Sequence, residues 1–316
     1  MAGIEWILNI QIYGIRDLVM DTAMDRRLFQ GLNELPQLPD LSKDELDEEM
    51  RAVYDDIERT LRVPFVNFIF RSLANFPEHF VPAWKALSPH LRRVECERAG
   101  QQLRGLAANE IAVEPFPKNI LSIEDHNAIA AFTDSIHYVL PKLLLTATAL
   151  DMQASGDFVI RPEPSAGDVT TIPYGIAQGT GPLPLLDPAD ADDRVRALFK
   201  DIQEQHGHPG VASYYRGLGQ YPIFLDQVWQ EVRRHVDTDS YRQRKQSALA
   251  LAESLADREL VRRARRPLAA APDTVREILA VFRYRLITDL LLDVTLIQAM
   301  LGDPQAAAYS RFSVSG

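Results

Sequence analysis

Two stretches of this sequence carry side chains that suit a small-molecule site, and the stretches are copies of each other. The first is residues 63–84, VPFVNFIFRSLANFPEHFVPAW, and the second is residues 208–229, HPGVASYYRGLGQYPIFLDQVW. Four paired positions differ sharply: Phe65 with Gly210, Asn67 with Ala212, Phe68 with Ser213, and Ile69 with Tyr214. A pocket between the copies would therefore have one aromatic wall and one hydroxyl-bearing wall. Ordinary drift within a packed core explains the difference equally well.

Other chemistry-bearing motifs are scarce. The motifs of nucleotide, zinc-protease, serine-hydrolase and dithiol sites do not occur, so no cofactor is predicted. His206 and His208 are clustered, but no matching acidic pair is visible, so no metal site is predicted. Cys96 is the only cysteine and cannot form an internal disulfide, which fits a reducing cytoplasm. No paired-base motif surrounds it, so it is not predicted to be a nucleophile.

The two stretches belong to a longer internal repeat. Residues 52–84 align with residues 197–229 without a gap, and nine of the 33 positions are identical. The identical positions are Ala52/Ala197, Asp56/Asp201, Ile57/Ile202, Pro64/Pro209, Val66/Val211, Arg71/Arg216, Leu73/Leu218, Pro77/Pro222 and Trp84/Trp229. A one-residue shift carries the match onward and pairs Tyr138 with Tyr284 and Leu140 with Leu286. The aspartate and the arginine kept in both copies are expected to form structural ion pairs or caps.

Apolar spacing, capping residues and prolines predict helices along nearly the whole chain. Ser42 and Glu45 form a capping box that is expected to begin a helix ending near Leu61. Further helices are expected at residues 65–74, from Pro82, at 89–108, 123–137 and 140–153, and in the second half at 190–205, 239–265, 273–287 and 290–300. Residues 4–20 are expected to form a helical arm.

These elements predict an all-α fold built from two tandem helical repeats of about 120 residues, packed as a pseudo-twofold dimer. The predicted divisions are an N-terminal arm at 1–36, a first repeat at 37–157, a Pro- and Gly-rich connector at 158–184 and a second repeat at 185–316. A site at the pseudo-twofold interface would be lined by equivalent helices that have diverged.

Composition narrows the function. The 316 residues carry a net charge of −10, which argues against binding to nucleic acid or to anionic membranes. The N-terminus lacks the features of a secretion signal, and no apolar run is long enough for a membrane span, so a cytoplasmic protein is expected. The predicted partner is a small-molecule substrate, with a carboxylate as one class; a homodimer is left open.

At the repeat the sequence resembles a known family. VYDDIERTLRVPFVNFIFRSLANFPEHFVPAW (53–84), YVLPKLLLTATAL (138–150), LPLLD (183–187) and ASYYRGLGQYP (212–222) are similar to the group I 2-haloacid dehalogenases. The resemblance spans residues 40–303 and implies an all-helical, cofactor-independent pseudo-dimer with its active site between the repeats. In that family an aspartate activates a water molecule, which attacks the α-carbon directly and displaces halide with inversion.

The resemblance also implies positions for individual residues. The aromatic wall falls at Phe65 and Phe68, and the serine beside the catalytic aspartate falls at Ser213. The aspartate itself falls at Tyr214, and the asparagine that helps to hold the water falls at Leu140. The substrate pocket is thus predicted to contain Phe65, Asn67, Phe68, Tyr138, Leu140, Ser213 and Tyr284, with Tyr214 and Arg283 as catalytic candidates.

Three functions follow as hypotheses. The first is a dehalogenase-like enzyme, with hydrolase- or lyase-type acid–base chemistry, that has diverged from direct water attack; Arg283 would lower the pKa of Tyr214. The second is a non-catalytic protein that binds a small ligand on the same scaffold. The third is a true 2-haloacid dehalogenase with a relocated base, for which Asp201 and Glu204 are candidates.

Overall fold

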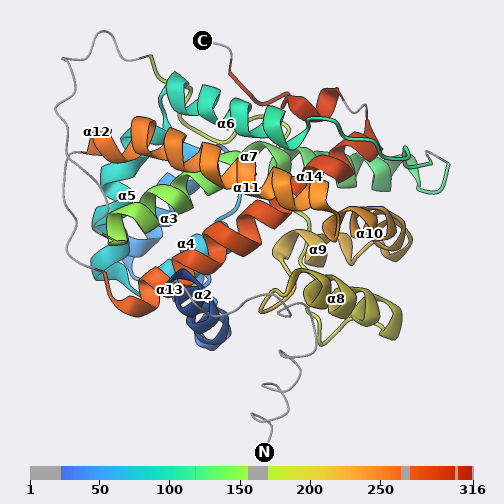
Figure 1. Ribbon diagram of the computed structural model, residues 1–316, viewed down its shortest axis with the longest axis horizontal. Coiled ribbons are helices and arrows are strands. Elements are labelled where there is room, and N and C mark those ends of the chain that lie inside the picture. The colour runs from blue at the N-terminus through green and yellow to red at the C-terminus, as the bar shows by residue number, and fades with distance from the viewer. Residues whose placement is uncertain (1–22, 118, 156–169, 265–270, 303–304, 315–316) are drawn as a thin grey trace, which may run out of the picture.

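The protein is an all-helical molecule (Figure 1). The computed structural model describes residues 23–117, 119–155, 170–264, 271–302 and 305–314. Within these ranges there is no β-strand, and the one isolated bridge pairs Arg93 with Thr171. The predicted all-α class is therefore confirmed, whereas the expected arm at residues 4–20 lies outside the described residues.

The described chain runs through thirteen α-helices. They are α2 (Ala23–Glu34), α3 (Glu48–Leu61), α4 (Phe68–Leu73), α5 (Pro77–Leu91), α6 (Val94–Ala107), α7 (Ile123–Ser155), α8 (Asp193–His206), α9 (Ser213–Leu218), α10 (Pro222–Val236), α11 (Asp239–Ala256), α12 (Arg262–Ala264), α13 (Asp273–Val281) and α14 (Ile287–Leu301). Two π-helical turns, η3 (Asp257–Val261) and η4 (Phe282–Leu286), join α11 to α12 and α13 to α14. Short 3₁₀ turns are η1 (Leu35–Gln37), η2 (Lys43–Glu45) and η5 (Ala306–Ala308).

Helix bounds recur between the two halves. Helices α3, α4 and α5 have the same lengths as α8, α9 and α10, and each begins 145 residues before its counterpart. A buried indole is held identically in both: Trp84 Nε1 donates to Asp56 Oδ2, and Trp229 Nε1 donates to Asp201 Oδ2, each at 2.7 Å. These aspartates therefore have structural partners. The packing of the halves about a twofold axis stays a prediction.

Several predicted helix boundaries in the first half were wrong. The capping box of Ser42 and Glu45 is present, but it caps the N-terminus of the 3₁₀ turn η2 only. Helix α3 begins later, at Glu48, where Asp47 is the N-cap and accepts a hydrogen bond from the Met50 amide. Helix α4 is shorter than predicted, because its N-cap residue Asn67 is extended. Helix α5 begins at Pro77 rather than at Pro82 as predicted; a proline suits the first helical position because it has no amide to leave unpaired.

Helix α7 is one continuous helix of 33 residues with Pro141 inside it, although two separate helices were predicted at residues 123–137 and 140–153. Proline removes an amide donor and leaves the carbonyl four residues earlier without its helical partner. Here Arg104, on α6, donates to the carbonyl oxygens of His137 (3.4 Å) and Tyr138 (3.1 Å). The buried guanidinium therefore replaces the hydrogen bond that the proline cannot make.

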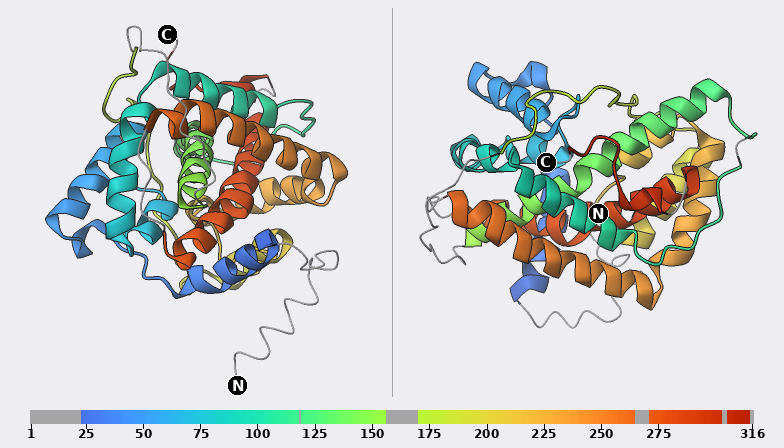
Figure 2. Two further views of the ribbon diagram at one scale, coloured as in Figure 1. Left: turned by 60° about the vertical axis from the view of Figure 1, so that its left-hand side comes forward. Right: turned by 90° about the horizontal axis from the view of Figure 1, so that it is seen from above.

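Helix α7 is the centre of the core. It packs against α6, α11, α13 and α14, and the left view of Figure 2 shows it in the middle of the other helices. Its counterpart, residues 273–301, is likewise a continuous run of α13, η4 and α14 rather than the two helices predicted. Of the described helices, α7 alone is long and apolar enough to cross a membrane, but 78% of its most apolar window is buried inside the protein.

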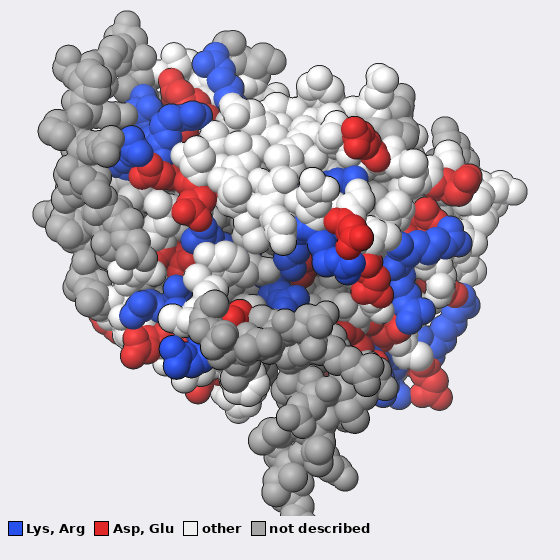
Figure 3. Space-filling view, viewed as in Figure 1, with Lys and Arg blue, Asp and Glu red and all other residues white. Residues whose placement is uncertain are grey.

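The surface shows no large area of a single charge on the face seen in Figure 3, where acidic and basic side chains are interspersed. A nucleic-acid site would instead present a continuous basic stripe. This face therefore agrees with the expectation drawn from the net charge.

Arg104 should be needed for stability because it completes the backbone of α7 at Pro141. We expect Arg104→Met to lower the free energy of unfolding by about 2–4 kcal/mol, since it removes a buried guanidinium and leaves the buried carbonyl group of His137 without a donor. Urea denaturation would measure the loss. Arg98→Met, at an exposed position of α6, is the control and should change stability by less than about 0.5 kcal/mol. Equal effects of the two substitutions would contradict this role.

Candidate functional site

A small pocket lies where the repeated helices α4 and α9 meet α7 and α14. Its volume is about 80 Å³, well below the several hundred Å³ of sites for drug-sized ligands. Its lining residues are Asn67, Phe68, Ile69, Ile136, Leu140, Leu143, Ala212, Ser213, Tyr214, Phe282, Leu286, Ile287 and Leu290. The pocket thus draws on both halves of the chain and takes only a small ligand.

Five of the nine predicted site residues line this pocket: Asn67, Phe68, Leu140, Ser213 and Tyr214. Phe65 is partly buried against the core but does not line it. Tyr138, Arg283 and Tyr284 also lie outside its lining. The structure therefore brings the residues of α4, α7 and α9 together and leaves the predicted arginine and two tyrosines elsewhere.

The aromatic wall of the pocket is built from both halves of the chain. The ring of Phe68 on α4 meets the ring of Phe282 edge to face, with their centroids 5.5 Å apart. Phe282 was not predicted. It begins the π-helical turn η4, and such turns are frequent at functional sites. A π-turn of this kind leaves no periodic signal in the sequence.

Tyr214 is fixed on the opposite wall. Its hydroxyl lies 3.1 Å from the Thr133 hydroxyl, its ring stacks on Phe132, and only 1% of the residue is exposed. Burial raises the pKa of Tyr214 well above its ordinary value. The phenol is therefore neutral at physiological pH, so it can donate a hydrogen bond but is a poor base.

Arg283 does not reach Tyr214. Its guanidinium binds Asp151 Oδ2 at 2.9 Å and Glu253 Oε2 at 2.5 Å, and it lies over the ring of Tyr284. Arg27 on α2 binds the other oxygen of Asp151. The expected effect of Arg283 on the pKa of Tyr214 was therefore wrong: the arginine belongs to an ion-pair cluster on the far side of η4.

Tyr138 belongs to a different buried cluster. Its hydroxyl accepts a hydrogen bond from Lys142 Nζ at 2.6 Å, and Lys142 forms an ion pair with Glu97 at 2.7 Å. Arg62 donates both to this hydroxyl and to the carbonyl oxygen of Phe312, near the C-terminus. Tyr138 thus helps to hold the C-terminal segment rather than lining the pocket.

The pocket itself carries no charge. Among the described residues that line it, none is acidic or basic, and the polar groups come from Asn67, Ser213 and Tyr214. The buried Asn67 Oδ1 has no hydrogen-bond partner within the described chain. Buried acceptors are normally satisfied, so this oxygen is suited to a ligand hydroxyl or an ordered water molecule.

The bases proposed for a relocated mechanism lie away from the pocket. Asp201 Oδ2 accepts from Trp229 and pairs with Arg233 at 3.3 Å. Glu204 pairs with Lys200 at 3.7 Å across one turn of α8. Neither carboxylate is among the lining residues.

Comparison with known proteins identifies the family. Residues 64–215 match the family model described as "Halocarboxylic acid dehydrogenase DehI". The chain is 30% identical over 295 residues to a configuration-inverting 2-haloacid dehalogenase of Alcaligenes xylosoxydans xylosoxydans; the match covers 87% of this chain and 98% of that protein. The chain belongs to the 2-haloacid dehalogenase family. A configuration-inverting 2-haloacid dehalogenase of Pseudomonas sp. (strain 113) is 32% identical over 213 residues, or 64% of this chain and 68% of the relative.

Solved structures of 2-haloacid dehalogenases share the fold. A D-2-haloacid dehalogenase in complex with L-LA superposes with a TM-score of 0.73 at 20% identity, over 84% of this chain and 96% of the other. A mutant of a D-2-haloacid dehalogenase with D-2-CPA gives a TM-score of 0.71 at 22% identity over the same shares. Structural likeness at these identities establishes the common helical architecture of the dehalogenase family for this chain.

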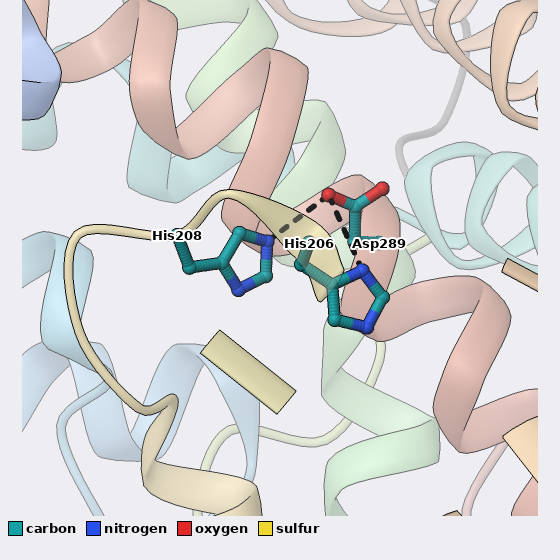
Figure 4. A group of neighbouring side chains, drawn as sticks. All are labelled: His206, His208 and Asp289. Atoms are coloured by element: carbon teal, nitrogen blue, oxygen red, sulfur yellow. Dashed lines mark hydrogen bonds and ion pairs between the residues drawn. The ribbon is translucent and has the colours of Figure 1, made fainter. Parts of the chain in front are cut away.

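The two clustered histidines do have an acidic partner, which the sequence did not reveal. Asp289 on α14 places Oδ2 3.0 Å from His208 Nε2 and 4.0 Å from His206 Nδ1 (Figure 4). The rings are nearly parallel, with 14° between their planes, and Lys245 binds the other carboxylate oxygen at 2.5 Å. Because a ring nitrogen binds metal in the plane of its ring, parallel rings do not aim at one ion. The arrangement is a paired ion cluster.

Burial and pairing shift the pKa values of this cluster in opposite directions. Burial lowers the pKa of His208 to about 4. Burial also acts to lower the pKa of His206, but Asp293 outweighs it and raises that pKa. Burial would raise the pKa of Asp289, whereas Lys245 and the histidines hold it well below its usual range. His208 is therefore neutral at pH 7 and Asp289 is ionised.

The depressed pKa of His208 predicts a loss of stability in acid. Unfolded chains take up a proton near pH 6.5, whereas folded His208 does so near pH 4, so stability falls as the pH drops through this window. We expect the free energy of unfolding of His208→Gln to fall by roughly 1–3 kcal/mol less than that of the native protein over this pH range. Thermal denaturation between pH 4 and 7 would measure it. His126→Gln, at a partly exposed site on α7, should keep the native slope; an unchanged slope in His208→Gln would contradict the assignment.

Proposed function

We propose that the protein is a dehalogenase-like enzyme with hydrolase- or lyase-type chemistry, whose site between α4 and α9 has diverged from direct water attack. The observation that carries this proposal is the state of Tyr214. The residue stands where the family resemblance implies the catalytic aspartate, yet its buried phenol is neutral and is bonded to Thr133. Tyr214 would orient a substrate by donating a hydrogen bond.

The pocket also limits the substrate. An ionised carboxylate buried without a cation is costly, and the described lining offers no cation. The substrate would therefore place a small apolar part against Phe68 and Phe282 and keep any carboxylate toward solvent. Asn67 and Ser213 would contact its polar groups.

The same proposal places the site between two helical repeats. Support comes from the lining, which takes Phe68 and Leu140 from the first half and Ser213, Phe282 and Leu290 from the second. The recurring helix bounds are further support. The divisions at 37–157 and 185–316, and the pseudo-dimeric arrangement of the two parts, belong to this proposal.

A non-catalytic ligand-binding protein is the second candidate. It is favoured by the absence of any acidic or basic group among the described lining residues. Thermal-shift measurements against small acids and small apolar compounds, paired with product analysis, separate the candidates. Stabilisation with turnover supports the enzyme, whereas stabilisation without turnover supports the binding protein.

Halide release tests the divergence directly. The protein would be incubated with D- and L-2-chloropropionate, and chloride would be followed by ion chromatography. We expect native release to be roughly 100-fold or more below that of the double variant Tyr214→Asp/Leu140→Asn, because a positioned base contributes about that much.

Single variants serve as the controls for this experiment. Tyr214→Phe keeps the ring without the hydroxyl, and Leu140→Asn alone supplies no base; neither should gain release. Rapid release by the native protein would overturn the proposed divergence. Loss of such release in Asp201→Asn or Glu204→Gln would then identify a relocated base.

A further inference from the structure

A group of ionisable side chains beside the pocket has no part in the proposed function. They are His206 on α8, His208 in the next loop, Tyr215 on α9, Tyr241 and Lys245 on α11, and Asp289 and Asp293 on α14. We call them the second-half cluster. All are buried except Lys245, whose side chain is 18% exposed.

Direct contacts link the members of the second-half cluster. Asp293 is its centre: it accepts hydrogen bonds from the hydroxyls of Tyr215 and Tyr241, each at 2.8 Å, and lies 2.9 Å from His206 Nε2. One turn earlier on α14, Asp289 pairs with Lys245 and His208. Helices α8, α9 and α11 are thereby all tied to α14.

The first half shows that the fold does not need these charges. At the seven counterpart positions the first half has Leu61, Val63, Phe70, Cys96, Gly100, Leu143 and Ala147, all of them buried. At these seven positions the counterpart helices therefore pack through uncharged, mostly apolar residues, and the buried ion pair of the first half, Glu97 with Lys142, lies at other positions. Burying ion pairs is costly and often less stable than apolar packing, so the second-half cluster calls for a role beyond filling the core.

The cluster adjoins the pocket through two helices. On α9, Tyr215 directly follows the pocket residues Ser213 and Tyr214. On α14, Asp293 lies one turn beyond the pocket residue Leu290, in the stripe that begins with Leu286. The hydrogen bond between Tyr215 and Asp293 thus joins the two walls just behind the ligand space.

Helix α9 needs such an anchor. It has six residues, and helices this short have little stability of their own. Its counterpart α4 is held by apolar contacts alone at the matching position, where Phe70 packs against Phe80 and Trp84. In α9 the hydroxyl of Tyr215 adds a hydrogen bond to Asp293. Because this bond is directional, it fixes the rotation of α9 about its own axis as well as its distance from α14.

We propose that the second-half cluster positions α9 against α14, so that Ser213 and Tyr214 face the pocket, and that Asp293 is its central positioning residue. The link to ligand binding rests on the proposed function of the pocket. The positioning of α9 does not, because it concerns the free protein.

Hydrogen–deuterium exchange tests the positioning without any ligand. Asp293→Asn keeps the size of the side chain and removes its charge. We expect exchange of the α9 amides at residues 213–218 to quicken about tenfold or more, because each bond to a charged group resists local opening. Exchange in α4, residues 68–73, should stay at the native rate. Unchanged exchange in α9 would overturn the proposal.

Tyr215→Phe keeps the test decisive if Asp293→Asn fails to fold. It removes one hydroxyl and introduces the ring that the first half has at this position, so the same selective quickening in α9 is expected. Tyr54→Phe removes a buried hydroxyl bonded to Leu41 in the first half and should leave α9 unchanged. Equal exchange in Tyr215→Phe and native protein would refute the anchor.

Affinity for D-2-chloropropionate, measured by calorimetry, adds a readout that a general loss of stability would not produce. We expect Tyr215→Phe to weaken binding in step with the α9 exchange, and Tyr54→Phe to leave binding intact. If the native protein binds no such acid, the link between the second-half cluster and ligand binding fails, while the exchange result still decides whether the cluster positions α9. A stoichiometric metal ion that is lost in Asp289→Asn would overturn the positioning role, because the cluster would then be a metal centre.

Discussion

The fold depends on giving partners to the charged groups that its helices bury. Lys142 is paired with Glu97, Arg283 with Asp151, and Lys245 with Asp289, all inside the helical core. An unpaired charge in such surroundings costs several kcal/mol, so each pair fixes two helices relative to each other. Lys142, Arg283 and Asp289 each stand next in the chain to a pocket-lining residue, while the described pocket lining holds no charge. The site is thus a neutral space among paired ions, and this constrains both its ligand and its chemistry.

Much of the fold could be predicted because short-range sequence patterns determine most of the helices. Apolar spacing and prolines located most helices, and the repeated tryptophan and aspartate positions do form equivalent hydrogen bonds. The errors arose where a distant side chain overrode a local rule. Pro141 signals a break, but Arg104 supplies the missing donor from another helix, 37 positions earlier in the chain. Local sequence holds no information about such a partner.

Some of the predicted site residues line the pocket and others do not, and the reason is geometric. Phe68, Ser213 and Tyr214 could be predicted to share a pocket because they lie on helices whose repeat register is clear, whereas Leu140 was predicted from the family resemblance. Arg283 was misplaced because it lies in η4, where a π-turn alters the helical phase. A change of one position rotates a side chain by about 100° around the helix. Phe282 therefore faces the pocket while its neighbour Arg283 faces Asp151.

Under the proposed function, the chain departs from the family pattern at positions 214 and 140, and these two departures are physically coupled. A carboxylate at position 214 would be buried beside Phe132 and Thr133, with only a hydroxyl to stabilise its charge. An amide at position 140 would supply a further donor, but Leu140 supplies none. With leucine there, a neutral hydrogen-bonding group is the polar side chain that position 214 can hold at least cost. The tyrosine and the leucine therefore fit each other, and under the proposed function a carboxylate base in this pocket requires a change at both positions.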